Sequence, residues 1–154
     1  MKTLEAIEFA LKSLSIKRQT EHEMREKIRN RFPNADLDTV ITRLKELDYL
    51  DDQSFASAFI RHRSLSSPRG SYALRQELKR KGVSEADMES ALSHFEDEEE
   101  AVIESLARKK WAQIREANAF KKRQKLQRFL LSRGFAVSSV LEAVNSVANG
   151  QEDC

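Results

Sequence analysis

The chain has 154 residues, with 27 Lys and Arg against 25 Asp and Glu, a formal charge of +2 and a single cysteine. Four Gly and two Pro are too few for the turns of an all-β fold, and the lone Cys154 excludes a disulfide framework and a cysteine zinc site. No stretch of about 18 apolar residues is present, as a membrane-spanning helix would need. Glu5 and Glu8 lie where a signal peptide would need an uncharged apolar stretch. These features predict a cytoplasmic helical protein that does not enter a membrane.

Apolar residues recur at helical spacing along the first fifty residues, which predicts three helices there. The residues with this spacing are Leu4, Ile7, Leu11, Leu14, Met24, Ile28, Leu37, Val40, Ile41, Leu44 and Leu47. Asp36 and Ser84 precede apolar-periodic segments, as N-caps do. Gly82 and Gly134 follow basic helical segments, where left-handed C-cap residues are typical.

The apolar pattern repeats along the chain, with Leu74 and Leu78 lying 52 residues before Leu126 and Leu130. The same shift relates six further pairs: Gly82 and Gly134, Val83 and Phe135, Met88 and Val140, Ala91 and Ala143, Leu92 and Val144, and Phe95 and Val147. A first-helix pair is expected in each repeat: Ile7 and Leu11, Phe55 and Phe59, and Val102 and Leu106. The predicted fold is therefore all-α, an elongated and curved array of three tandem three-helix repeats. We expect repeats at residues 3–50, 51–95 and 97–148, followed by a disordered tail at 149–154.

Basic residues gather in three blocks, each of which spans the middle helix of one repeat. Residues 108–133 carry ten basic side chains against Glu116 alone. Such faces predict a phosphate-containing partner that is contacted through its backbone, independently of sequence. The candidate contacts are Arg25, Lys27, Arg31, Arg75, Lys79, Lys81, Lys121, Lys122, Lys125 and Arg128.

Three other features allow two interpretations each. The acidic run Glu96 to Glu100 is expected to start a helix and favour its dipole, or else to form an acidic docking patch. Trp111 follows three cations, so it either packs between repeats or stacks on a base, and Tyr72 has the same ambiguity.

The sequence contains no motif for catalysis or for a cofactor. No glycine-rich phosphate loop is present, and His22, His62 and His94 are too scattered to form a metal site. Asp51 and Asp52 directly precede a predicted helix, where carboxylates cap free backbone N–H groups. We therefore expect neither a metal nor a cofactor nor an enzyme, although a magnesium-dependent nuclease using these two carboxylates is an alternative.

Three segments together resemble the RecX family of recombination regulators. They are LDYLDDQSFASAFIRHR at residues 47–63, GSYALRQELKRKGVS at 70–84 and QKLQRFLLSRGF at 124–135. The resemblance runs from about residue 4 to 148 and keeps the order of the three segments. One departure is Asp48, where the family pattern usually has glycine before the tyrosine. Aspartate is among the better substitutes if that glycine is left-handed.

The resemblance implies a non-enzymatic regulator that binds the RecA filament on DNA along its groove. It would inhibit the recombinase, ATPase and coprotease activities of RecA and thereby modulate recombinational DNA repair and the SOS response. An array with basic blocks at regular intervals could bind such a partner by multivalency, and we expect it to do so as a monomer. The alternative is a general module for single- or double-stranded DNA that acts by competition for the DNA.

Overall fold

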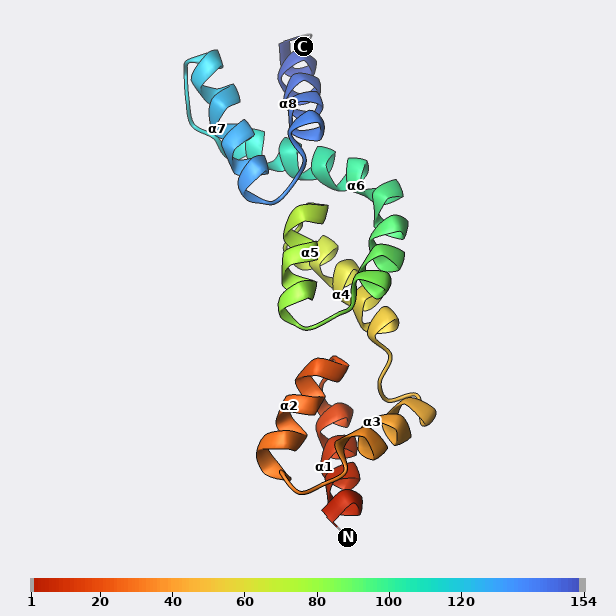
Figure 1. Ribbon diagram of the computed structural model, residues 1–154. Helices are drawn as coiled ribbons and strands as arrows, with labels where there is room; N and C mark the ends of the chain where they lie inside the picture. The colour runs from red at the N-terminus through yellow and green to blue at the C-terminus, as the bar shows by residue number, and fades with distance from the viewer. Residues whose placement is uncertain (1, 153–154) are drawn as a thin grey trace. The chain divides into compact units, whose positions relative to one another are not determined.

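The computed structural model describes residues 2–152 and is helical throughout (Figure 1). Within this range there are eight helices and no strand, which confirms the predicted all-α class. The helices are α1 (Lys2–Ile16), α2 (Glu21–Arg31), α3 (Leu37–Glu46), α4 (Asp52–Ser66), α5 (Ser71–Arg80), α6 (Glu85–Gln113), α7 (Ala119–Ser132) and α8 (Val137–Glu152). None of them is both long and apolar enough to cross a bilayer.

Local chemistry explains where these helices begin. Thr20 caps α2 through a capping box, because its hydroxyl accepts from the Glu23 amide while the Glu23 carboxylate accepts from the Thr20 amide. Asp36 caps α3 as predicted, and hydrogen bonds from the hydroxyl and amide of Thr39 lower the pKa of its carboxyl. Ser84 likewise accepts from an amide in the first turn of α6. These acceptors satisfy amides that have no partner within the helix.

The helices end at left-handed residues in the predicted places. Gly82 and Gly134 have φ of 82° and 88°, and Asp48 has φ of 62°. After α3, the amide of Tyr49 bonds the carbonyl of Leu44 at 2.9 Å, just as the amide of Val83 bonds that of Leu78 at 3.1 Å after α5. Asp48 thus replaces glycine in a Schellman-type C-cap, which confirms that aspartate accommodates the left-handed conformation.

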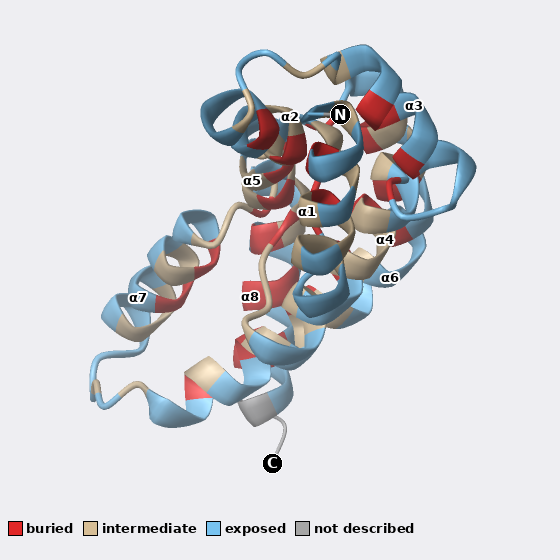
Figure 2. Cartoon of the chain, turned by 90° about the horizontal axis from the view of Figure 1, so that it is seen from below, coloured by how far each residue is buried: buried red, intermediate tan, exposed pale blue. Residues whose placement is uncertain are grey.

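The chain divides into two compact units, Met1–Ala58 with Glu77–Ala91 and Phe59–Gln76 with Leu92–Cys154. In the first unit α1, α2 and α3 pack around one core, visible as red segments on these helices in Figure 2. The buried residues of this core are Ala6, Ala10, Met24, Ile28, Val40, Ile41, Leu44 and Leu50. Leu47, expected in the core, is 38% exposed because α3 ends at Glu46 and the chain turns there.

In the second unit the last part of α6 packs with α7 and α8. The buried core residues are Ile103, Ala107, Trp111, Leu126, Leu130, Phe135, Val140, Ala143, Val144, Val147 and Ala148. Every apolar residue of the pairs related by 52 positions is at least 94% buried, which confirms that periodicity. The boundaries of the three predicted repeats remain a prediction.

The first helices differ from expectation in which residues they bury. Ile7 and Leu11 are only partly buried, whereas Ala6 and Ala10 are fully buried. In α4, Ala56 and Ile60 are buried while Phe55 and Phe59 are partly buried, and in α6 Ile103 and Ala107 are buried while Val102 and Leu106 are partly buried. The buried positions thus lie one residue from the expected ones, and the alanines among them let neighbouring helices approach closely.

The acidic run Glu96 to Glu100 does not start a helix, so the dipole explanation is wrong. These residues lie within α6, which continues from Glu85 to Gln113 without the break expected near residue 96. One helix therefore serves as both the third helix of the second predicted repeat and the first helix of the third. At the carboxyl end, α8 includes residues 149–152 of the predicted tail, and residues 153–154 lie outside the described range.

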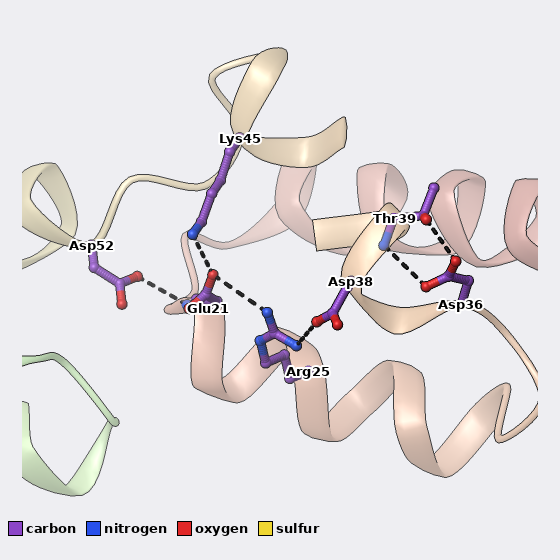
Figure 3. A network of polar contacts seen from close by, with 7 residues as sticks. All are labelled: Glu21, Arg25, Asp36, Asp38, Thr39, Lys45 and Asp52. Atoms are coloured by element: carbon purple, nitrogen blue, oxygen red, sulfur yellow. Dashed lines mark hydrogen bonds and ion pairs between the residues drawn. The ribbon is translucent and has the colours of Figure 1, made fainter. Parts of the chain in front are cut away.

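In the first unit, the start of α2 lies on the end of α5, a contact we call the first junction. The hydroxyl of Thr20 donates to the carbonyl of Lys81, and the carboxylate of Asp52 accepts from the Glu21 amide at 2.9 Å (Figure 3). A Cβ on Gly82 would collide with the side chain of His22. The Glu21 amide is thus satisfied by a carboxylate 31 residues further along the chain, and the Thr20 hydroxyl by a carbonyl 61 residues further along.

In the second unit, the start of α5 lies on the end of α7, the second junction. The Gly70 amide donates to the carbonyl of Arg133 at 2.8 Å, and the Glu99 carboxylate accepts from the Ser71 amide at 3.0 Å. A Cβ on Gly134 would collide with Ala73. The two junctions therefore share the same kinds of contact. Glu99, a member of the acidic run, acts as a cap for the start of α5.

Truncating a core leucine should destabilise the protein far more than truncating its exposed neighbour. Leu130 is fully buried and Leu131 is 37% exposed in the same helix turn. We expect Leu130→Ala to lower the free energy of unfolding by about 2 to 5 kcal/mol, the usual range for truncating a buried leucine to alanine. Leu78→Ala should have an effect in the same range. Leu131→Ala should cost less than about 1 kcal/mol. Urea unfolding checks this, and equal effects for Leu130 and Leu131 would contradict the described packing.

Removing a junction carboxylate should also destabilise the fold. Asp52→Ala and Glu99→Ala each leave one helix-starting amide without its acceptor, so each should lower the free energy of unfolding by about 0.5 to 2 kcal/mol. Glu98→Ala, at an exposed neighbouring position, is the matched control and should have little effect. If Glu98→Ala cost as much as Glu99→Ala, the capping role of Glu99 would be rejected.

The carboxylate of Asp52 should also make the stability of the fold depend on pH. Burial raises the pKa of Asp52, against the opposing effect of the Glu21 amide. The folded state therefore holds this proton more tightly than the unfolded chain, and stability from this group falls as the pH rises through its folded pKa. Asp52→Asn keeps an acceptor oxygen without the charge, so its stability relative to the wild type should increase from acid to neutral pH in urea unfolding.

Candidate functional site

The two adjacent carboxylates considered for catalysis have structural roles. Asp51 accepts from the Ser54 amide at 3.1 Å and caps α4, and Asp52 caps α2. Each carboxylate is therefore directed at a backbone amide and not at a shared reaction centre. In the described part of the chain, no group of three or more His, Cys, Asp and Glu could hold a metal ion. The basic side chains are therefore the remaining candidates for a functional site.

The predicted contacts on α2 interact closely with their own repeat. Arg25 bonds Asp38 at 3.0 Å and lies 3.9 Å from Glu21, which also pairs with Lys45 (Figure 3). Lys27 reaches the hydroxyl of Ser13 at 3.3 Å. The guanidinium of Arg31 covers the rings of Phe9 and Phe32, with centroid distances of 5.1 and 5.8 Å. A partner that uses these cations must compete with contacts already made.

The predicted contacts on and after α5 differ in exposure. Lys79 is exposed in the last turn, and Arg75 is half-buried. Lys81 is half-buried, lies 3.8 Å from Glu23 and covers the Phe55 ring at 5.9 Å. Lys81 also provides the carbonyl of the first junction, so its backbone is fixed while its ammonium group neutralises the capping box of α2.

The predicted contacts on α7 differ in exposure, and Figure 2 shows exposed residues along this helix. Lys121 and Arg128 are exposed. Lys125 is half exposed and lies 3.6 Å from Glu116. Lys122 covers the ring of Trp111 at 4.2 Å. Within residues 2–152, Lys125 is paired with a carboxylate, whereas Lys121 and Arg128 of α7 are not.

A hollow of about 450 Å³ opens between the end of α6 and α7, which we call the basic hollow. Its lining residues are Lys110, Ile114, Arg115, Lys125, Arg128 and Phe129. Two of the predicted contacts, Lys125 and Arg128, meet here. Lys110 and Arg115 were not predicted, although both belong to the basic block at residues 108–133. The chain turns between α6 and α7, and this turn brings them beside α7.

Both aromatic residues considered for base stacking now have defined surroundings. Trp111 is 6% exposed and belongs to the core of the second unit, so it packs and does not offer a face to a base. Its packing partners lie within the last repeat and not between repeats. Tyr72 is 65% exposed at the start of α5.

An acidic counterpart lies elsewhere on the second unit. A hollow of about 380 Å³ between α6 and α8 is lined by five glutamates together with small and apolar residues: Glu96, Glu99, Glu100, Glu104, Glu142, Ile103, Ala143, Ser139 and Ser146. Opposite charges are thus separated on one unit, with the glutamates along the middle of α6 and the cations at its end. A polyanion would be repelled from the first region and attracted to the second.

Two family models match the chain. RecX, second three-helix domain, matches residues 51–92, and RecX, third three-helix domain, matches residues 97–144. The chain is 33% identical over 143 residues to Regulatory protein RecX of Chlorobium phaeobacteroides, covering 92% of this chain and 93% of that protein. It is 35% identical to Regulatory protein RecX of Halalkalibacterium halodurans over 150 residues, which is 94% of this chain but 55% of that longer protein.

Solved structures agree on the fold. The crystal structure of RecX from Lactobacillus salivarius matches with a TM-score of 0.83 at 22% identity, covering 95% of this chain and 96% of that one. A second crystal structure, titled regulatory protein RecX, matches with a TM-score of 0.80 at 25% identity, covering 94% and 73%. The chain therefore belongs to the RecX family, whose members are regulatory proteins and not enzymes, as its sequence predicted.

Proposed function

We propose that this protein binds the RecA filament on DNA along its groove and inhibits the recombinase, ATPase and coprotease activities of RecA. It would thereby modulate recombinational DNA repair and the SOS response. The observation that carries the proposal is membership of a family of regulatory proteins, shown by relatives that match more than nine-tenths of the chain. The separated basic surfaces supply a physical means of binding a partner that contains DNA.

The proposed contacts are the basic residues of the three middle helices. They are Arg25, Lys27, Arg31, Arg75, Lys79, Lys81, Lys121, Lys122, Lys125 and Arg128. Cations on exposed helix faces attract phosphates without reading sequence, which suits a filament that assembles on any DNA. Contacts on several repeats would add by multivalency, because each bound repeat raises the effective concentration of the next.

The test of this proposal separates filament regulation from competition for DNA. RecA is first assembled on saturating single-stranded DNA, and its rate of ATP hydrolysis is followed while this protein is added at substoichiometric levels. We expect the rate to fall, because a regulator bound to the filament acts without freeing DNA. An unchanged rate, together with binding of the protein to bare DNA, would instead favour a general DNA-binding module.

Reversing the charge of α7 should weaken partner binding. Lys121→Glu, Lys125→Glu and Arg128→Glu together should leave the helix content unchanged, because all three side chains are exposed or half exposed. If each cation contacts one phosphate of a single strand, the slope of log affinity against log salt should flatten by about 2. Circular dichroism and binding titrations at several salt concentrations measure these effects.

The matched control carries the same charge change at Lys2, Lys12 and Arg61, three exposed cations outside the proposed contacts. This triple variant should retain most of the affinity and the wild-type salt slope. If both triple variants lost affinity equally, the effect would be one of net charge, and the face on α7 would not be a contact surface.

A further inference from the structure

The basic hollow has an excess of positive charge that the rest of the described chain does not neutralise. Four cationic side chains line it, from Lys110, Arg115, Lys125 and Arg128, and among residues 2–152 the one carboxylate paired with any of them is that of Glu116. Within residues 2–152, the guanidinium groups of Arg115 and Arg128 make no ion pair and no hydrogen bond. Cations held this close repel one another, so an anion in the hollow is favoured.

The free groups are the ones best suited to a phosphate. A guanidinium presents a planar fork of N–H donors that can bond two oxygens of one phosphate at once. Arg115 and Arg128 reach the hollow from different segments, one from the segment after α6 and the other from α7. Ile114 and Phe129 line the same hollow with apolar atoms, which limit hydration of a bound anion and strengthen its attraction to the cations.

The aromatic rings near the hollow are already covered. The ammonium group of Lys110 lies 4.6 Å from the Phe129 ring centroid, and that of Lys122 lies 4.2 Å from the Trp111 ring. Trp111 itself is 6% exposed. Stacking of a base needs an open ring face. The hollow therefore offers no platform for stacking bases.

Glu116 occupies part of this site. Its half-buried carboxylate lies 3.6 Å from the ammonium group of Lys125, which is one of the two lining cations on α7. A phosphate entering the hollow must share Lys125 with this carboxylate and is repelled by its charge. Glu116 thus acts as a built-in competing anion, and its removal should strengthen the binding of phosphate.

We propose that the basic hollow binds a phosphodiester group of single-stranded DNA, independently of the base, and that Glu116 competes with it. The strand is favoured over a free phosphate because exposed Lys121 lies one turn before Lys125 and Arg128 follows on the same face of α7, so cations continue beyond the hollow. This proposal deepens the proposed function, since it names a DNA contact that a filament regulator would use.

The test measures binding of the full chain to a fluorescent oligothymidylate by anisotropy, without RecA. Arg115→Gln and Arg128→Gln should each weaken binding about tenfold, the loss expected for one charge-assisted hydrogen-bonded contact. Glu116→Gln should strengthen binding several-fold. Arg61→Gln removes an exposed arginine outside the hollow and should change affinity less than twofold. Oligodeoxyadenylate of the same length should bind with the same affinity.

Three results would overturn the proposal. The first is that Arg128→Gln weakens binding no more than Arg61→Gln does, and the second is that Glu116→Gln weakens binding. The third would show that the hollow binds free phosphate and not a DNA strand. In that case saturating inorganic phosphate would shift the side-chain NMR signals of Arg115 and Arg128, and oligothymidylate would not displace the bound phosphate. Unfolding curves show whether each variant is folded, and because Glu116→Gln is expected to gain affinity, misfolding cannot produce the expected result.

The outcomes also separate this inference from the proposed function. If the hollow variants bind DNA as the wild type does but the wild-type protein inhibits ATP hydrolysis by preassembled RecA, the inference fails and the proposed function stands. If the hollow variants lose DNA binding while the wild-type protein has no effect on the filament, the inference stands and the proposed function fails.

Discussion

The free amides at the start of the second helix in a repeat are the constraint on which this fold depends. At both junctions these amides are partly buried, so they need acceptors, and the acceptors come from segments later in the chain. A carboxylate from a later helix bonds the first amide, at Asp52 and at Glu99, and the end of another later helix supplies a carbonyl. Later segments of the chain therefore complete the hydrogen bonding at the starts of α2 and α5, and the opposed ends of two helix dipoles attract across each contact.

This arrangement also determines which cations remain available. The basic side chains lie on the second helices, whose starts are covered at the junctions, while α7 begins with its own cap at Asn118. A cation at a junction is less available to a partner. Lys81 is an example, because its ammonium group lies near Glu23 and its carbonyl accepts a hydrogen bond from Thr20. On α7 the exposed face belongs to no junction inside the described chain beyond the one at Arg133 and Gly134. The cations that line the basic hollow therefore take no part in either junction.

Sequence periodicity was sufficient to predict the all-α class and the buried residues of the 52-residue repeat, because apolar spacing and glycine at a left-handed position are local signals. Periodicity did not predict the features that depend on contacts between helices distant in the sequence. Ala6 and Ala10 are buried because helices cross closely there, and alanine carries little hydrophobic signal. Glu99 caps a helix that begins 28 residues earlier, so the acidic run was misread as a helix start. Lys110 and Arg115 join the site only through the turn between α6 and α7, which no spacing rule on one helix could place.

In the proposed contact, the predicted repeats would contribute unequally to binding, because their cations are paired to different extents. On α2, Arg25 would have to leave Asp38 at 3.0 Å and Glu21 at 3.9 Å to reach a phosphate, and exchanging one ion pair for another gains little. Within residues 2–152, Arg128 and Arg115 make no such pair, so the whole of their interaction with a phosphate would count toward affinity in the proposed contact. A multivalent contact built this way would be strongest at the third repeat, with the first repeat adding orientation more than binding energy. Glu116 then sits at the position where one carboxylate has the largest effect on the whole contact.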